Sequence, residues 1–294
     1  MRNYKEKIIQ ILLTSLAFAS LFFLIGIVFI LVKESIPIIS EINFLEFLFG
    51  KEWYPSRQPP QLGIFPLITA SLLVTAGALS ICIPLGVGAA LYINELAGIK
   101  QKKILKPLIE ILAGIPSIVY GFFGMLIAAP FIQKIFNIPT GLCALTASVM
   151  LGIMAIPTVT SISEDALSSV PKSFKEASYA LGANRIQTLF KVIIPAAASG
   201  ISTSIILGAS RIVGETMTVL MVSGGAAVVA KSFFVPVRPM TSTIAAEMGE
   251  AAVGSPHYHA LFAIGLILFL ITLIFNAGAE HISKKYRIKL GLGR

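Results

Sequence analysis

Charge is scarce in this sequence. Asp, Glu, Lys and Arg make up only 13% of its 294 residues, whereas 56% are hydrophobic, and the mean hydropathy is +0.88. A soluble domain carries about 25% charged residues. The deficit excludes an ordinary soluble domain and predicts a chain that crosses a membrane several times.

Cysteine and histidine are also rare, with two and three residues respectively. Cys82 and Cys143 both lie inside apolar runs, where cysteine is typically a small buried side chain, so we expect no disulfide framework. His257 and His259 have no carboxylate or thiolate cluster in support, so we expect no metal site. No nucleophile, base and orienting residue come together in the sequence, which disfavours an enzyme.

Six apolar runs are long enough to cross a bilayer, which takes roughly 20 apolar residues in a helix. The second run is expected to kink near Pro84, and the fourth to begin after Pro139. The fifth is expected to continue through Arg211 and Glu215 toward Val222. The six runs are Ile8–Val32, Ile64–Asn94, Ile111–Gln133, Ile135–Ser163, Val192–Ala209 and His257–Ala279.

The basic residues indicate how these helices are oriented. The net charge is +9, and most Lys and Arg residues gather in four segments on one side of a six-helix topology. Because such residues mark cytoplasmic loops, we expect both termini to be cytoplasmic. We interpret the basic excess as topology signals and contacts with lipid head groups, not as a nucleic-acid-binding surface. The segments contain Arg2, Lys5 and Lys7; Lys100, Lys102, Lys103 and Lys106; Lys172, Lys175, Arg185 and Lys191; and Lys284, Lys285, Arg287, Lys289 and Arg294.

A polar segment, residues 164–195, separates the fourth run from the fifth. Pro171 ends the preceding chain, because proline breaks a helix interior. Ser173 and Glu176 have the spacing of a capping box, which predicts a short helix through Ala180.

A second short helix is expected directly after the first. Gly182 suits the left-handed position that often ends a helix. Asn184 and Gln187 form a second, looser capping box. The sequence therefore predicts two short helices joined by a glycine-dependent turn, which we call the elbow, able to move as a unit in a partner's groove.

The same segment resembles a family signature. Glu176–Pro195, EASYALGANRIQTLFKVIIP, is similar to the E-A-A-x3-G-x9-I-x-L-P pattern of permease subunits of binding-protein-dependent ABC importers. Ser178, Val192 and Ile194 are conservative departures from it. The resemblance implies a MetI-like permease fold in which the elbow docks on a separate ATPase, so that ATP is bound by that partner and this chain needs no cofactor. The implied coupling residues are Glu176, Ala177, Gly182, Asn184, Arg185 and Pro195.

Two charges interrupt the fifth apolar run. An intramembrane Arg costs roughly 2.5–3.5 kcal/mol on insertion scales, so Arg211 needs a partner or water. Glu215 lies four residues on and is expected to pair with it on one helix face. The pair either pins the helix or lines a translocation path in which Arg211 is available to an oxyanion. Both hold if Glu215 masks Arg211 until substrate arrives.

Further motifs narrow the resemblance. S-R-x-x-G-E-T-M at Ser210–Met217 and GIPSIVYG at Gly114–Gly121 are similar to PstC-type permeases of phosphate importers, with a CysTW-like subfamily character. So are Met240–Glu250 with His257–Phe262, and the start of the second run at Gly63–Pro66. Thr69-Ala-Ser-Leu72 replaces the family's Gly-Thr-Leu. The resemblance covers nearly the whole chain from Trp53 onward.

This narrower resemblance implies a machine in a prokaryotic inner membrane. Its parts are a PstA-like permease that forms a heterodimer with this chain, two copies of a PstB-like ATPase, and an extracytoplasmic PstS-like phosphate-binding protein. The implied path residues are Arg211, Glu215 and Thr216. Glu247 and Glu250 are expected on the solvated face of an amphipathic outer segment. The expected domain is single, 1–294, with a first helix and outer segment in 1–63 and a permease core in 64–282.

Two alternatives stay open. The first is an ABC importer for another oxyanion, such as molybdate, sulfate or phosphonate, because the elbow is shared among such permeases. The second is a secondary, ion-coupled transporter that uses Arg211 and Glu215 as a relay, since broken helices and intramembrane charges occur there too. The elbow disfavours this second alternative.

Overall fold

The computed structural model describes residues 2–289; Arg294 of the basic tail and the last residues of the expected domain lie outside them. Within this range, six helical stretches are long and apolar enough to cross a membrane. This confirms the all-helical membrane architecture. The spans are Glu6–Ser40, Phe65–Leu96, Ser117–Phe136, Ala144–Ser168, Arg185–Val213 and Pro256–Gly278.

The core forms around α7 (Ala144–Ser168), which packs against α3 (Phe65–Leu91) and α10 (Ile194–Val213). In its most apolar window 61% of the residues are buried, against 33% or less in the other spans. Small residues permit this close packing: a Cβ on Gly86 of α3 would lie 2.9 Å from Cβ of Val159. Helix contacts in membranes depend on such small residues, because lipid removes the hydrophobic drive.

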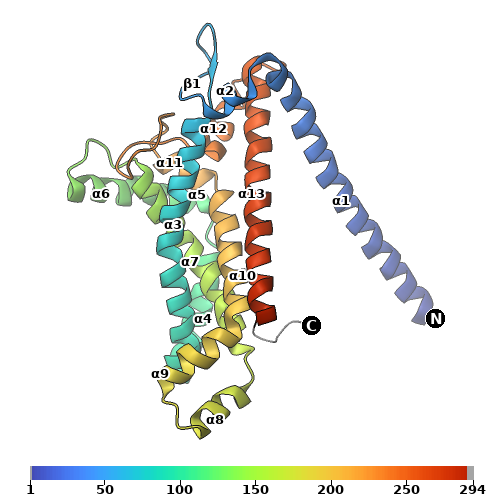
Figure 1. Ribbon diagram of the computed structural model, residues 1–294, viewed down its shortest axis with the longest axis vertical. Coiled ribbons are helices and arrows are strands. Elements are labelled where there is room, and N and C mark those ends of the chain that lie inside the picture. Colours follow the sequence, from blue (N-terminus) through green and yellow to red (C-terminus); the bar gives the residue numbers. More distant parts are fainter. Residues whose placement is uncertain (1, 290–294) are drawn as a thin grey trace.

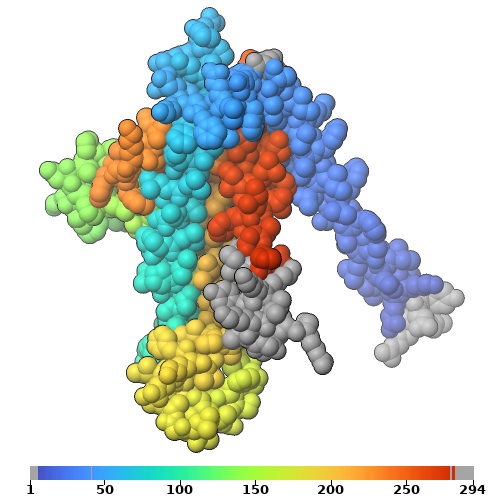
Figure 2. Space-filling view, in the orientation of Figure 1, coloured from blue at the N-terminus to red at the C-terminus, as the bar shows by residue number. Residues whose placement is uncertain are grey.

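Helix α1 (Arg2–Glu41) stands apart from this core. It meets α13 (Pro256–Lys289) at one end and diverges from it along its length (Figures 1 and 2). None of its most apolar window is buried within the chain. The apolar surface of α1 is therefore left for lipid or for another subunit.

Helix α1 continues to Glu41, beyond the predicted end at Val32, and two further differences from the predicted boundaries affect the candidate site. The third span does not begin at Ile111, because α4 (Ile99–Ala113) is a separate helix that is capped by Gly114. Pro116 then adopts an extended ψ of 142°, and the membrane span begins at α5 (Ser117–Phe123) and continues through η2 (Gly124–Ala128) and α6 (Ala129–Phe136). The fifth helix does not reach Val222 unbroken: α10 ends at Val213, and α11 (Met217–Val222) is a new helix.

One end of the molecule carries small elements that the sequence did not predict. They are α2 (Phe44–Phe49), a hairpin of β1 (Trp53–Tyr54) and β2 (Gln61–Leu62), and α12 (Met240–Glu247). The strands are antiparallel with Trp53 opposite Leu62. A cluster of buried apolar side chains anchors this hairpin end to α13: Ile38, Phe47, Trp53, Leu62, Leu67, Met240 and Leu261.

The opposite end carries the elbow. It consists of α8 (Lys172–Ala180) and α9 (Arg185–Thr188), beside η1 (Tyr92–Leu96) at the end of α3 and η3 (Leu189–Ile193) at the start of α10. The free ends of α1 and α13 point toward this same elbow end, away from the hairpin (Figure 1). The arrangement agrees with the four basic segments of the sequence lying on one side.

Candidate translocation and coupling sites

The predicted path residues lie at a break between two helices. After α10 ends, residues 214–216 form a turn that leads into α11, and we call this turn the path break. Arg211 and Glu215 do not form the expected ion pair. Arg211 Nη1 faces Oγ1 of Thr158 at 3.5 Å, while Glu215 Oε1 accepts the amide hydrogen bond of Thr218 at 3.2 Å. The expected pairing required a continuous helix, and the end of α10 removes it.

Three elements hold the path break in place. Thr218 Oγ1 on α11 donates to the carbonyl of Ser117 at the start of α5, at 2.9 Å. Thr241 Oγ1 on α12 donates to the carbonyl of Glu215 at 2.9 Å. Two interrupted spans therefore meet here, and non-helical backbone at membrane depth is tolerated where protein or a water-filled cavity surrounds it.

The arrangement leaves Arg211 chemically available. Its side chain is half-buried, and none of the carboxylates whose side chains the structure describes forms an ion pair with it. Thr216, also half-buried, has a hydroxyl that donates to the nearby carbonyl of Gly214, at 3.4 Å. A guanidinium in this setting is suited to a tetrahedral oxyanion, since its planar fork matches pairs of oxygens.

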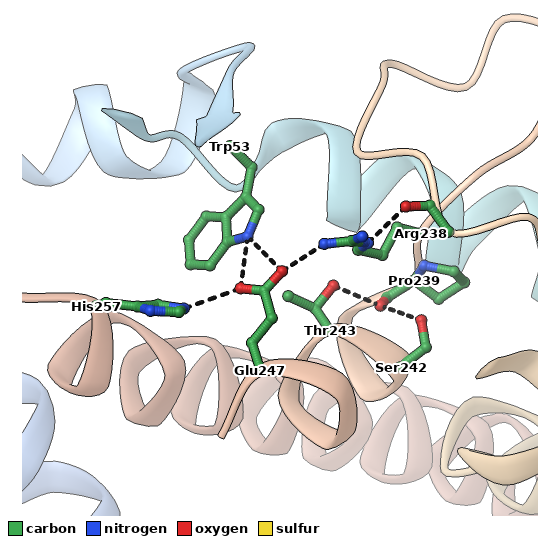
Figure 3. A network of polar contacts seen from close by, with 8 residues as sticks. Trp53, Arg238, Pro239, Ser242, Thr243, Glu247 and His257 are labelled. Atoms are coloured by element: carbon green, nitrogen blue, oxygen red, sulfur yellow. Dashed lines mark hydrogen bonds and ion pairs between the residues drawn. The ribbon is translucent and has the colours of Figure 1, made fainter. Parts of the chain in front are cut away.

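At the hairpin end, the carboxylate of Glu247 contacts three side chains that carry N–H groups (Figure 3). Trp53 Nε1 lies 3.0 Å from Oε2, His257 Nε2 lies 2.9 Å from Oε2, and Arg238 forms an ion pair with Oε1. We call these four residues the hairpin network. It joins the β-hairpin, the 223–239 loop, α12 and α13 around one carboxylate.

The hairpin network corrects the expectation that Glu247 lies on a solvated face. The Glu247 side chain is only 13% exposed, whereas Glu250 is exposed as expected. The two differ because α12 ends at Glu247, so the helical spacing that would place both on one face is lost. His259 does not join His257: its Nδ1 lies 2.9 Å from the carbonyl of Glu34 on α1.

The elbow is partly as predicted. Gly182 has φ +81°, which confirms the left-handed position. The second capping box is also confirmed, because the Gln187 amide donates to Asn184 Oδ1 at 2.8 Å and the Asn184 amide donates to Gln187 Oε1 at 3.0 Å. The first capping box, at Ser173 and Glu176, is wrong. Pro171 itself precedes the helix, which begins at Lys172, two residues earlier than an N-cap at Ser173 would place it, and Glu176 is exposed.

The elbow presents apolar side chains outward. Leu181 is 89% exposed and Ile186 68% exposed, although both are large and hydrophobic. A hollow of about 490 Å³ lies between α8 and the chain that follows the turn, lined by Phe174, Ala177, Leu181, Gly182, Gln187 and Lys191. The elbow forms the lobe at the lower end of Figure 2. Pro195 is the second residue of α10 and lies directly after the π-helical turn η3.

Two buried acids near the elbow were missed in the sequence. Glu164, whose side chain is 4% exposed, accepts from Lys106 Nζ at 2.7 Å and Lys102 Nζ at 3.0 Å, which ties α4 to α7. Glu95, 9% exposed, lies 2.6 Å from Lys175 Nζ. Each is the first charged residue after a long uncharged run, and this position in the sequence could have marked them as acids at the end of a membrane span.

The tie between α4 and α7 persists across the physiological pH range. Hydrogen bonds from Lys106 to the Glu164 and Asp165 carboxylates raise the pKa of the Lys106 ammonium. A raised lysine pKa means that the stabilisation is complete below the ordinary lysine range and is lost only as the pH rises above it.

Comparison with known proteins identifies the family. Residues 82–288 match the model of the binding-protein-dependent transport system inner membrane component. The chain belongs to this family. It is therefore a multi-pass inner membrane permease subunit, as the elbow signature indicated.

Individual relatives agree. The chain is 38% identical over 251 residues to the probable ABC transporter permease protein YqgH of Bacillus subtilis, covering 85% of this chain and 81% of the relative. It is 33% identical over 264 residues to the phosphate transport system permease protein PstC of Mesorhizobium japonicum, covering 83% and 80%. A probable PstC of Methanocaldococcus jannaschii is 29% identical over 90% of this chain and 91% of its own.

Solved structures share the fold. A bacterial alginate ABC transporter, solved with an alginate-bound periplasmic protein, has a chain with a TM-score of 0.66 and 15% identity, covering 94% of both chains. The MetNI methionine ABC transporter in an inward-facing conformation has a TM-score of 0.56 and 21% identity, covering 76% of this chain and 94% of its own. These similarities confirm the MetI-like permease fold.

Proposed function

We propose that this chain is the PstC-type permease subunit of an ATP-driven phosphate importer and forms half of its translocation path. The substrate class is inferred from Arg211, a half-buried guanidinium at the path break that has no carboxylate partner among the side chains described by the structure. The names of the PstC relatives support phosphate among the oxyanions. The chain does no chemistry, and ATP is hydrolysed by a partner.

The partners follow from the two ends of the molecule. The elbow end is cytoplasmic, with both termini, and its exposed Leu181 and Ile186 dock into a PstB-like ATPase dimer. The hairpin end faces outward and receives a PstS-like phosphate-binding protein. A PstA-like permease completes the heterodimer, and the basic segments contact lipid head groups. The whole chain acts as one transmembrane domain.

Transport proceeds by alternating access. The loaded binding protein docks at the hairpin end, and ATP closes the two ATPase subunits. Their closure moves the elbow, and α10 moves with it because α9, η3 and α10 form one continuous helical stretch. The path break then turns inward, and phosphate passes Arg211.

Uptake by the complete complex tests this function. Proteoliposomes with both permeases, the ATPase and the binding protein should accumulate radiolabelled phosphate only when ATP is supplied on the side of the membrane where the ATPase is bound. Excess sulfate or molybdate should compete weakly. Preferential uptake of one of those anions would assign the permease to another oxyanion, and phosphate uptake without any ATPase would assign it to the secondary transporters.

Replacing Gly182 tests the coupling role of the elbow. Gly182→Val should lower the number of phosphate ions transported per ATP hydrolysed several-fold, because a β-branched residue at positive φ costs about 1–3 kcal/mol and distorts the turn. Gly182→Asn is the matched control, since asparagine tolerates the left-handed conformation. The measurement is the ratio of phosphate uptake to ATP hydrolysis. A wild-type ratio for Gly182→Val would show that coupling does not depend on the geometry of this turn.

A further inference from the structure

Glu95 connects the elbow to a span that is remote from it in the sequence. It lies in η1, the π-helical turn that ends α3, and its side chain is 9% exposed. Lys175 on α8 places its Nζ 2.6 Å from the Glu95 carboxylate. Arg185 on α9 donates to the main-chain carbonyl of the same residue. Both short helices of the elbow are therefore attached to one residue of η1, which continues α3.

The elbow is also closed upon itself. The hydroxyls of Ser178 on α8 and Thr188 on α9 are buried and lie 2.9 Å apart. Across the turn, the amide of Gly182 donates to the carbonyl of Tyr179 at 2.9 Å, and that of Ala183 donates to the carbonyl of Ser178 at 3.1 Å. Opening the two helices about Gly182 would break the buried contact between Ser178 and Thr188. The contacts therefore favour motion of the elbow as one rigid piece.

We propose that Glu95 is a positioning residue that locks this rigid elbow to α3, so that a displacement of the elbow reaches two spans at once. One route is covalent, through η3 into α10. The other is the contact of Lys175 and Arg185 with Glu95. Since α3 and α10 both pack on α7, the two routes enclose the most buried helix of the core. The proposal rests on the proposed function in that an ATPase pushes on the elbow.

The functional test uses charge removal and charge exchange in the assembled transporter. Glu95→Gln and Lys175→Gln should each lower the ratio of phosphate uptake to ATP hydrolysis at least fivefold, while the ATPase still co-purifies. The exchange Glu95→Lys with Lys175→Glu should restore much of the ratio, which a general loss of folding would not allow. Lys172→Gln, an exposed lysine on the same helix, is the matched control and should behave as wild type. Normal coupling in both single variants would overturn the proposal.

A second readout does not depend on the transported substrate. Spin labels on Lys172→Cys of α8 and Lys100→Cys of α4, the helix that follows η1, report the distance across this contact; the native Cys82 and Cys143 are buried. The mean distance between the labels should be the same without nucleotide and with trapped ATP. In Glu95→Gln, the distribution of this distance should become broader. A nucleotide-dependent change in the otherwise wild-type protein would overturn the lock. A complex that fails to transport phosphate but keeps this distance would overturn the substrate assignment alone.

Discussion

Arg211→Gln is expected to lower phosphate uptake roughly tenfold to a hundredfold in a fully assembled transporter. A hydrogen bond to a charged group contributes about 1.5–3 kcal/mol, and each 1.4 kcal/mol corresponds to about a factor of ten. Glutamine keeps donors near Thr158 but removes the positive charge that faces the path break. The measurement is the initial rate of ATP-dependent uptake of radiolabelled phosphate in proteoliposomes.

Assembly and charge specificity separate this effect from misfolding. The variant should still co-purify with the second permease and the ATPase, because Arg211 forms no ion pair with any described carboxylate side chain on which folding could depend. Lys134→Gln, at an exposed lysine on α6, is the control and should leave uptake unchanged. Wild-type uptake by Arg211→Gln would take Arg211 out of the path.

Glu247→Ala is expected to cause the largest loss of stability. It leaves Trp53, Arg238 and His257 without the carboxylate that holds them, in a site where Glu247 is only 13% exposed. Removing one partner of a mostly buried ion pair costs roughly 3 kcal/mol. The midpoint of thermal unfolding in detergent should fall by roughly 5–10 °C.

Glu250→Ala provides the comparison, because Glu250 is the same residue type three positions on and is exposed. Surface substitutions of this kind stay within about 0.5 kcal/mol. The hairpin network also reaches the path break through α12, whose Thr241 donates to the carbonyl of Glu215. If Glu247→Ala and Glu250→Ala unfold at the same temperature, the hairpin network does not stabilise the hairpin end.

Local features of this fold were predictable from the sequence. The membrane spans could be predicted because hydropathy depends on a single stretch of sequence. The left-handed conformation of Gly182 and the capping box at Asn184 could be predicted because they depend on residues within three positions of each other. The start of the third span was misplaced at Ile111 because α4 carries apolar residues up to the break at Pro116. The Arg211–Glu215 pair failed for the same kind of reason: one glycine, Gly214, ended the helix on which the pairing depended.

Six membrane spans could be derived from hydropathy, and the permease family from the resemblance of a twenty-residue motif, because both are local features of the chain. Which charged side chains lie together became clear only in the folded structure. Glu95 contacts Lys175, which is 80 residues away in the sequence, and Glu247 contacts Trp53, which is 194 residues away. The physical reason is that a contact between distant residues depends on which elements pack side by side, and this packing is a property of the whole fold.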